Sequence, residues 1–191
     1  MKEQQPRYVF KICLIGSGGV GKTCIARRLC FDTFDARTQL TIGIDFYTYD
    51  IPIIVKGEET FARLTIWDFG GQEQFKNLFS YYINGANGIF LVFDLIDIET
   101  LTRLDWWYDQ LIVYNLQDHP KILIGTKLDL VENVDKKHKI DELIIEQFLK
   151  SHDEKDFIKT SSKENTNILK SFKNLLKKVL DAHYLIYEEI L

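Results

Sequence analysis

The stretch that decides the fold of this chain is Gly16-Ser17-Gly18-Gly19-Val20-Gly21-Lys22-Thr23. An apolar, β-branched run at 9–15 precedes it and indicates a strand, and residues 24–30 follow with helical spacing of their apolar side chains. This is the context in which G-x-x-x-x-G-K-[ST] binds phosphate, because backbone N–H groups and the helix N-terminus then surround the anion. We therefore predict that Lys22 reaches the β- and γ-phosphates of a nucleotide and that the Thr23 hydroxyl ligates Mg²⁺. The flanking strand and helix disfavour the alternative, an ordinary flexible turn.

The composition is that of a globular domain. The 191 residues are 46% hydrophobic and 27% charged, and the net charge of −4 argues against a nucleic-acid-binding surface. The cysteines are odd in number and fit neither a disulfide framework nor a zinc site, which favours a reducing compartment: Cys13, Cys24 and Cys30. Residues 1–7 lack the apolar core of a signal peptide, no apolar run could cross a bilayer, and residues 187–191 hold no cysteine for prenylation. We expect one cytoplasmic, monomeric domain over residues 1–191, without a transmembrane segment or a nucleic-acid partner.

Strands alternate with helices along the chain. Six segments have strand patterns: 9–15, 41–49, 61–67, 88–93, 121–125 and 156–160. Helical patterns lie at 24–30, before 83, and at 99–116, 140–150 and 168–180. With a hairpin turn at 56–59, this order predicts an α/β, three-layer P-loop NTPase fold, with a six-stranded, mostly parallel sheet, one antiparallel edge strand and helices on both faces. Residues 181–191 remain open between a helix extension, an oligomer contact and the stub of a removed tail.

Three further segments follow strands at the edge where such a sheet binds ligands. Asp68 ends the third strand, where a carboxylate can hold Mg²⁺; the alternative is a solvated acid at a strand end. Asp129, in Thr126-Lys127-Leu128-Asp129, can accept hydrogen bonds from N1–H and the exocyclic amine of guanine, two donors that adenine lacks. Ser161-Ser162-Lys163 follows the last strand and can offer a backbone N–H to the guanine carbonyl. Either loop alone is better explained by a plain turn, but their order and placement after the phosphate loop favour a guanine nucleotide.

With these motifs the chain resembles Ras-superfamily small GTPases, and among them it is most similar to Rab proteins. The resemblance covers about residues 8–180 and rests on the base-binding loops and on residues 16–23, 40–46, 67–75 and 81–86. Phe34, twelve residues after Lys22, stands at the position of the family's base-covering aromatic residue. The resemblance implies that Thr41 binds Mg²⁺ through its hydroxyl and positions water through its carbonyl. It also implies that the Gly71 N–H contacts the γ-phosphate and that Gln72 orients the attacking water.

The resemblance supplies a set of expected site residues. Catalytic roles fall to Gln72, Lys22, Thr41 and Gly71, and metal binding to Thr23, Thr41 and Asp68. The nucleotide is expected to lie against Ser17, Gly18, Gly19, Val20, Gly21, Lys22, Thr23, Cys24, Phe34, Thr126, Lys127, Asp129, Ser161, Ser162 and Lys163. The implied function is a switch that binds GTP or GDP with Mg²⁺ and hydrolyses GTP, in which switch I (about 35–46) and switch II (about 69–82) report the γ-phosphate.

The chain departs from the Rab pattern at several points. Phe69-Gly70 stands where Rab proteins have Thr-Ala and is closer to Arf and Gα proteins. The second glycine makes the backbone freer, so we expect the nucleotide to control a larger rearrangement. Thr126 replaces the commoner asparagine, as in Rho-type proteins, and Thr38 stands where many Ras-type proteins have an aromatic lid. Together with the lack of prenylation cysteines, these features suit a divergent, prokaryotic or archaeal member.

The switch segments also carry apolar side chains. We expect effectors, exchange factors and GTPase-activating proteins to contact Ile42, Ile44, Phe46, Trp67, Phe75 and Tyr82, and Phe46, Trp67 and Tyr82 occupy the positions of the Rab aromatic triad. Trp106 points away from the inner face of its helix, which leaves either a second contact surface or packing on a neighbouring loop. Arg37 and Arg63 are better explained as surface charges than as catalytic arginines, so we expect slow hydrolysis without an activating protein.

Two other functions remain open. One is a GTP-binding scaffold with negligible hydrolysis, although Gln72, Thr41 and Gly71 favour the hydrolysing switch. The other is an ATP-using P-loop protein, for which Asp129 would be incidental. Asp68-Phe69-Gly70 also matches the metal motif of kinases, but no kinase catalytic-loop signature accompanies it, which excludes that class.

Overall fold

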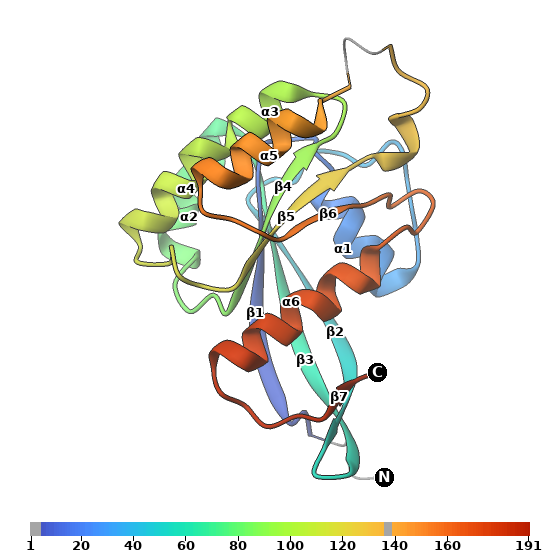
Figure 1. Cartoon of the computed structure of the whole chain (residues 1–191), viewed down its shortest axis with the longest axis vertical. Helices are drawn as coiled ribbons and strands as arrows, with labels where there is room; N and C mark the ends of the chain where they lie inside the picture. Colours follow the sequence, from blue (N-terminus) through green and yellow to red (C-terminus); the bar gives the residue numbers. More distant parts are fainter. Residues whose placement is uncertain (1–4, 136–138) are drawn as a thin grey trace.

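A computed structural model describes residues 5–135 and 139–191; residues 1–4, part of the stretch in which no signal peptide is expected, lie outside them. Its centre is a seven-stranded sheet in the order β6-β5-β4-β1-β3-β2-β7 (Figure 1). Strands β1, β3, β4, β5 and β6 are parallel, whereas β2 and β7 pair in antiparallel fashion. The predicted α/β class and mostly parallel sheet are therefore confirmed. The strands are β1 (Tyr8–Ile15), β2 (Ile44–Val55), β3 (Glu58–Phe69), β4 (Gly88–Asp94), β5 (Lys121–Thr126), β6 (Phe157–Lys159) and β7 (Glu189–Ile190).

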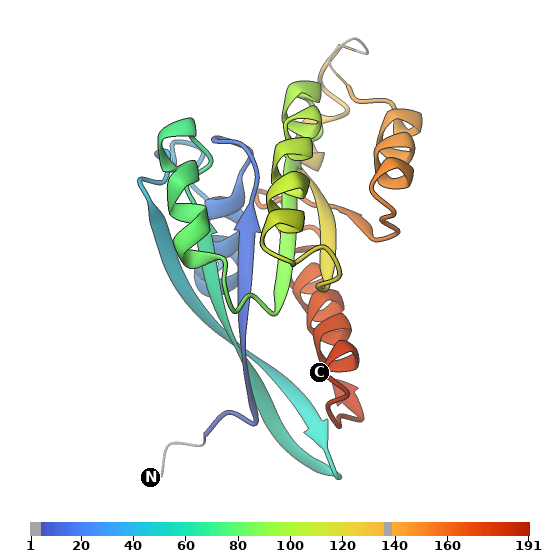
Figure 2. The same cartoon turned by 90° about the vertical axis from the view of Figure 1, so that its left-hand side faces the viewer.

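Helices cover both faces of the sheet (Figures 1 and 2). Helices α1 and α6 pack on the face that receives Phe10, Ile12 and Leu14 of β1, and α2 to α5 pack on the face that receives Cys13 and Ile15. Because successive side chains of a strand point to opposite faces, β1 is buried on both sides. The helices are α1 (Lys22–Phe31), α2 (Lys76–Tyr82), α3 (Ile98–Thr102), α4 (Leu104–Val113), α5 (Glu142–Ser151) and α6 (Ile168–Ala182), with short 3₁₀ turns η1 (Glu73–Phe75) and η2 (Leu128–Leu130).

The single helix predicted at 99–116 is two helices, α3 and α4. They meet at Arg103, whose backbone N–H is directed at the carbonyls of both Glu99 and Leu101. Sharing one donor between two carbonyls tightens the backbone locally, which interrupts the regular α-helical pattern.

The β2–β3 hairpin delivers both switch segments to the ligand-binding edge of the sheet. The predicted turn is confirmed: Lys56 and Gly57 both have positive φ, 54° and 76°, as tight hairpin turns require. The pairing then continues to Ile44 beside Phe69, at the far end of the hairpin. Strand β1 runs parallel to β3 with Leu14 beside Asp68, so the end of β3 lies next to the start of the phosphate loop.

The predicted total of six strands is wrong because the C-terminal residues add a strand. Helix α6 ends at Ala182, and the following segment returns to the sheet, where β7 pairs with Ile53 and Ile54 of β2 (Figure 1). The Glu188 N–H donates to the Ile54 carbonyl at 2.8 Å. Strand β2 is therefore not the edge of the sheet along its whole length. None of the described helices combines the length and apolar character needed to span a bilayer.

Candidate functional site

A cavity of about 470 Å³ opens at the carboxyl ends of the parallel strands. Most of the predicted site residues line it: Gly18, Gly19, Gly21, Lys22, Thr23, Cys24, Phe34, Thr41, Gly71, Gln72, Thr126, Lys127, Asp129, Ser162 and Lys163. Four do not line it but are buried: Ser17, Val20, Asp68 and Ser161. Ser17 lines a neighbouring cavity. The lining also includes Leu130 and four residues of the predicted switch I, none of them named among the expected nucleotide-binding residues: Asp35, Ala36, Gln39 and Leu40.

Lys22 is the buried cation of the cavity floor. It is the first residue of α1, and its ammonium donates to the carbonyls of Gly16 at 2.9 Å and Ser17 at 2.7 Å. Burial lowers the pKa of Lys22 to about 8, and the nearby Asp68 carboxylate only partly opposes this shift. Anionic phosphate groups in the cavity would stabilise the charged form, so this lysine is well suited to a polyphosphate.

Three oxygen-bearing side chains from different elements meet beside Lys22. The Thr23 hydroxyl donates to Asp68 Oδ2 at 2.5 Å, and the Thr41 hydroxyl lies 3.2 Å from the same oxygen. Asp68 is fully buried, and its Oδ1 has no hydrogen-bond partner among the described residues. Desolvation raises the pKa of Asp68, opposed by Lys22 and the two hydroxyls. A buried carboxylate with an unpartnered oxygen beside two hydroxyls is a donor set that suits Mg²⁺.

The two switch segments contact each other closely. The Gly70 N–H donates to the Gly43 carbonyl at 2.8 Å, and a Cβ placed on Gly70 would lie 2.7 Å from the Thr41 oxygen. A Cβ on Gly71 would lie 2.2 Å from the Gly16 oxygen of the phosphate loop. Close approach of backbone therefore excludes a side chain at both positions. Beside them, the Gln72 side chain lies against Gly18.

The base end of the cavity is built from β5 and the loops after β5 and β6. The Thr126 hydroxyl lies 2.6 Å from the Val20 carbonyl oxygen, which ties the end of β5 to the phosphate loop. The Ser161 hydroxyl donates to Asp129 Oδ1 at 2.6 Å, which joins the two predicted base-binding loops. Phe34 lines the cavity and is 38% exposed, as a residue that covers a ligand from the solvent side would be.

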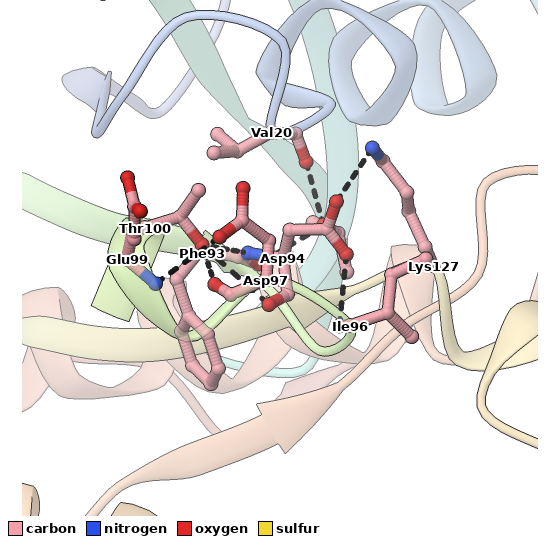
Figure 3. Close-up of polar contacts among 9 residues, drawn as sticks. Val20, Phe93, Asp94, Ile96, Asp97, Glu99, Thr100 and Lys127 are labelled. Atoms are coloured by element: carbon pink, nitrogen blue, oxygen red, sulfur yellow. Dashed lines mark hydrogen bonds and ion pairs between the residues drawn. The ribbon is translucent and has the colours of Figure 1, made fainter. Parts of the chain in front are cut away.

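Lys127 differs from the expectation in one respect. It lines the cavity, but its ammonium forms an ion pair with Asp94 Oδ2 at 2.6 Å, as Figure 3 shows. Asp94 is buried at the end of β4, and its other carboxylate oxygen accepts from the Ile96 N–H. Asp94 was not predicted, although it ends a buried strand just as Asp68 does. The ion pair restricts the lysine side chain, which would otherwise sample many rotamers.

The predicted partner surface is partly exposed. Phe46 and Tyr82 are exposed, and both rings contact the half-buried Trp67, with centroid distances of 4.6 and 6.1 Å. The Lys11 ammonium lies over the face of the Trp67 ring, 3.7 Å from its centre, in a cation–π contact. Ile42 is 82% exposed, whereas Ile44 and Phe75 are half-buried. An exposed aromatic and aliphatic cluster therefore spans both switch segments.

Of the two alternatives for Trp106, packing holds. The indole contacts Phe79 and Trp107, and the Lys76 ammonium lies 4.1 Å above its ring. Its partner is helix α2 within switch II rather than a loop. Trp106 therefore joins α4 to switch II and is half-buried there.

Neither Arg37 nor Arg63 lines the main cavity, and Arg63 pairs with Asp50 at 2.8 Å. Arg103, which was not predicted, lines a neighbouring cavity of about 340 Å³ together with Gln72. Its guanidinium is mostly exposed and pairs with Glu99 at 2.9 Å.

The fold and the cavity define an α/β protein with a glycine-rich loop, a buried lysine and a buried carboxylate at the carboxyl ends of its parallel strands. The family model for the Ras family matches residues 11–181. The chain is 35% identical to Ras-related protein Rab-18 of Lymnaea stagnalis over 183 residues, which cover 95% of this chain and 86% of the relative. It is 31% identical to GTP-binding protein ypt1 of Schizosaccharomyces pombe over 172 residues, which cover 90% and 80%. It is 33% identical to GTP-binding protein YPTM1 of Zea mays over 165 residues, which cover 86% and 75%.

The chain belongs to the Ras family, and its similarity to Rab and Ypt proteins extends over most of its length. The predicted resemblance is therefore confirmed.

Proposed function

We propose that this chain is a guanine-nucleotide switch that binds GTP and GDP with Mg²⁺ and hydrolyses GTP slowly. The observation that carries the proposal is the meeting of Thr23, Thr41 and Asp68 beside the buried Lys22 ammonium. Thr23 comes from the phosphate loop, Thr41 from switch I, and Asp68 from the end of β3, which runs into switch II. A nucleotide bound here would therefore affect the conformation of both switches. When bound, Mg²⁺ would neutralise charge on the β- and γ-phosphate oxygens.

The nucleotide would lie with its phosphates at the start of α1 and its base between Phe34 and the loops after β5 and β6. We assign guanine selection to Asp129, which would accept hydrogen bonds from N1–H and the exocyclic amine of the base. Backbone N–H groups of 161–163 would bind the guanine carbonyl. The Thr126 hydroxyl would hold the phosphate loop rather than the base, since its contacts are with Val20 and Phe93.

For hydrolysis, Gln72 and the Thr41 carbonyl would orient the attacking water, and the Gly71 N–H and Lys22 would stabilise charge that builds up on the γ-phosphate. The described residues that line the main cavity include no arginine. An arginine supplied by a partner is worth roughly 10³ to 10⁵ in rate, so we expect slow hydrolysis by the chain alone.

We further propose that partner proteins read the nucleotide state on the cluster of Ile42, Phe46, Trp67 and Tyr82. Exposed aromatic side chains that span both switches are suited to this, because a change in either switch alters the surface that they form. We propose that the chain acts as one monomeric, cytoplasmic GTP-binding domain.

The test is a chemical one. Nucleotide extracted with acid from freshly purified protein should be GDP or GTP, and GTP loaded in a single turnover should be converted to GDP and phosphate over minutes to hours. Extraction of an adenine nucleotide would overturn the guanine assignment. Stable GTP over the same period would instead support the scaffold alternative.

A further inference from the structure

Arg28 lies behind the base end of the main cavity and does not line it. The Arg28 side chain is 13% exposed, and its guanidinium faces the loop after β6: Nε donates to the Ser162 carbonyl at 2.7 Å, and Nη2 lies 3.3 Å from the Lys163 carbonyl. The remaining nitrogen, Nη1, faces the other way and donates to the backbone carbonyl and the carboxylate of Asp32, at 2.8 and 2.9 Å. One planar group thus joins two segments that are distant in sequence.

Each of these two segments leads to a wall of the base pocket. Ser162 and Lys163 line the cavity. Asp32 ends helix α1 with a left-handed backbone, φ 51°, and the chain that leaves it brings Phe34 into the cavity lining. The Asn165 side chain also reaches the Asp32 carboxylate, at 3.3 Å. Arg28 makes most of the side-chain contacts that join the two walls, and it would not touch the nucleotide itself.

The same helix carries the phosphate-binding residues. Lys22 begins α1, and Arg28 follows six residues later, roughly 9 Å along the helix axis at 1.5 Å per residue. A rigid helix therefore connects the phosphate end of the cavity to the Arg28 hydrogen bonds at its base end.

We propose that Arg28 is a positioning residue for the base: it holds the two walls together and thereby slows nucleotide release. The inference rests on the proposed function, which assigns 161–163 and Phe34 to the base. Removing the guanidinium frees the walls to separate, whereas the phosphate loop, Thr41 and Gln72 keep their contacts. Nucleotide release is therefore expected to change without a change in hydrolysis.

The experiment compares Arg28→Ala with wild type in two assays. Release of a fluorescent GDP analogue should accelerate by about tenfold or more, since two charge-assisted hydrogen bonds to the base loop are lost. Single-turnover hydrolysis of GTP loaded beforehand should stay within about twofold of wild type, because the reacting end is untouched. Amide hydrogen exchange should rise at 161–164 and remain unchanged at 18–23.

Arg27→Ala is the matched control. Arg27 is the neighbouring residue on α1, is exposed, and interacts with Tyr47 of β2 instead of the base loop. Its substitution should leave GDP release at the wild-type rate. Arg28→Lys should give an intermediate rate, because a single ammonium can bond to one wall but does not span both. If Arg28→Ala does not fold, GDP release from Arg28→Lys provides the same test.

Unchanged GDP release in Arg28→Ala, or in Arg28→Lys where that variant stands in for it, would overturn the inference. It would also fall if release, hydrolysis and melting temperature all changed in parallel, since that pattern indicates a general structural role. If wild type itself does not bind GDP, the proposed function fails. If wild type binds GDP tightly and release is unaffected by the substitution, only the role of Arg28 fails.

Discussion

The hydroxyl oxygens of Thr23 and Thr41 lie 2.7 Å apart, although the two residues are 18 positions apart in the sequence. Thr23 belongs to the rigid start of α1, whereas Thr41 belongs to switch I. Both lie within hydrogen-bond distance of Asp68 Oδ2. A cation held here would therefore fix the position of switch I relative to the phosphate loop, which is how a bound ligand can order a loop.

Removing the Thr41 hydroxyl should weaken this link. In Thr41→Ala, the Mg²⁺ concentration needed to retain a non-hydrolysable GTP analogue is expected to rise by about tenfold, because one oxygen ligand is lost. Retention of the labelled analogue would be measured across a magnesium titration. Thr48→Ala, on the exposed part of β2, is the control and should behave as wild type. An identical magnesium requirement in Thr41→Ala would refute this role.

Gln72 is expected to act in hydrolysis rather than in binding. Gln72→Leu keeps the volume of the side chain but cannot orient water, so single-turnover GTP hydrolysis should fall by about tenfold or more while GTP affinity is retained. The exposed neighbour Gln74 provides the control, Gln74→Leu, for which we expect the wild-type rate. Equal hydrolysis rates for Gln72→Leu and wild type would show that another group positions the water.

Gly70→Ala tests the contact between the switches. The new methyl group would meet the backbone oxygens of Thr41 and Gly43 at 2.7 and 2.9 Å, and carbonyl groups of the backbone cannot rotate away as a side chain can. We expect the free energy of unfolding to fall by about 1–3 kcal/mol, and amide exchange in 41–46 to increase. Denaturant unfolding and hydrogen exchange would measure the two effects. Wild-type values in both would mean that the close approach is not maintained in solution.

The lowered pKa of Lys22 predicts a pH dependence of stability in the nucleotide-free protein. The pKa is about 8 in the folded chain and near the ordinary value of 10.5 when unfolded. Between these values the unfolded chain binds more protons, so folding is favoured increasingly as the pH rises, by at most about 1.4 kcal/mol per pH unit. Relative to Lys22→Met, the free energy of unfolding of wild type should therefore increase from pH 8 to pH 10. Parallel curves for the two proteins would contradict a buried, charged Lys22.

Much of the site was predictable because its chemistry is local in sequence. The phosphate loop contains its own glycines, lysine and threonine. Asp68 lies at the end of a strand, and Asp129 and Ser161 follow strands, so the topology alone brings them to one edge. The sheet class followed from the alternation of strand and helix patterns.

The features that were not predicted are contacts between residues that are distant in the sequence. Pairing of β7 with Ile53 and Ile54 involves only two residues and leaves no periodic pattern. The hydrogen bond from Arg28 to Ser162 joins residues 134 positions apart. The ion pair between Lys127 and Asp94 forms only because β4 and β5 are adjacent and in register. For Trp106 the sequence left a second contact surface and packing on a loop open, and its partner, α2, comes from switch II. Local spacing cannot specify such contacts, because they depend on how the completed layers pack.

The most direct test of the account is the base preference of the purified protein. Affinities for fluorescent GDP and ADP would be measured with Mg²⁺ for wild type and for Asp129→Ala. We predict that wild type binds GDP at micromolar or lower concentration and at least about 100-fold more tightly than ADP, and that Asp129→Ala loses most of this preference. Equal affinities of wild type for GDP and ADP, or no binding of either, would contradict the central claim.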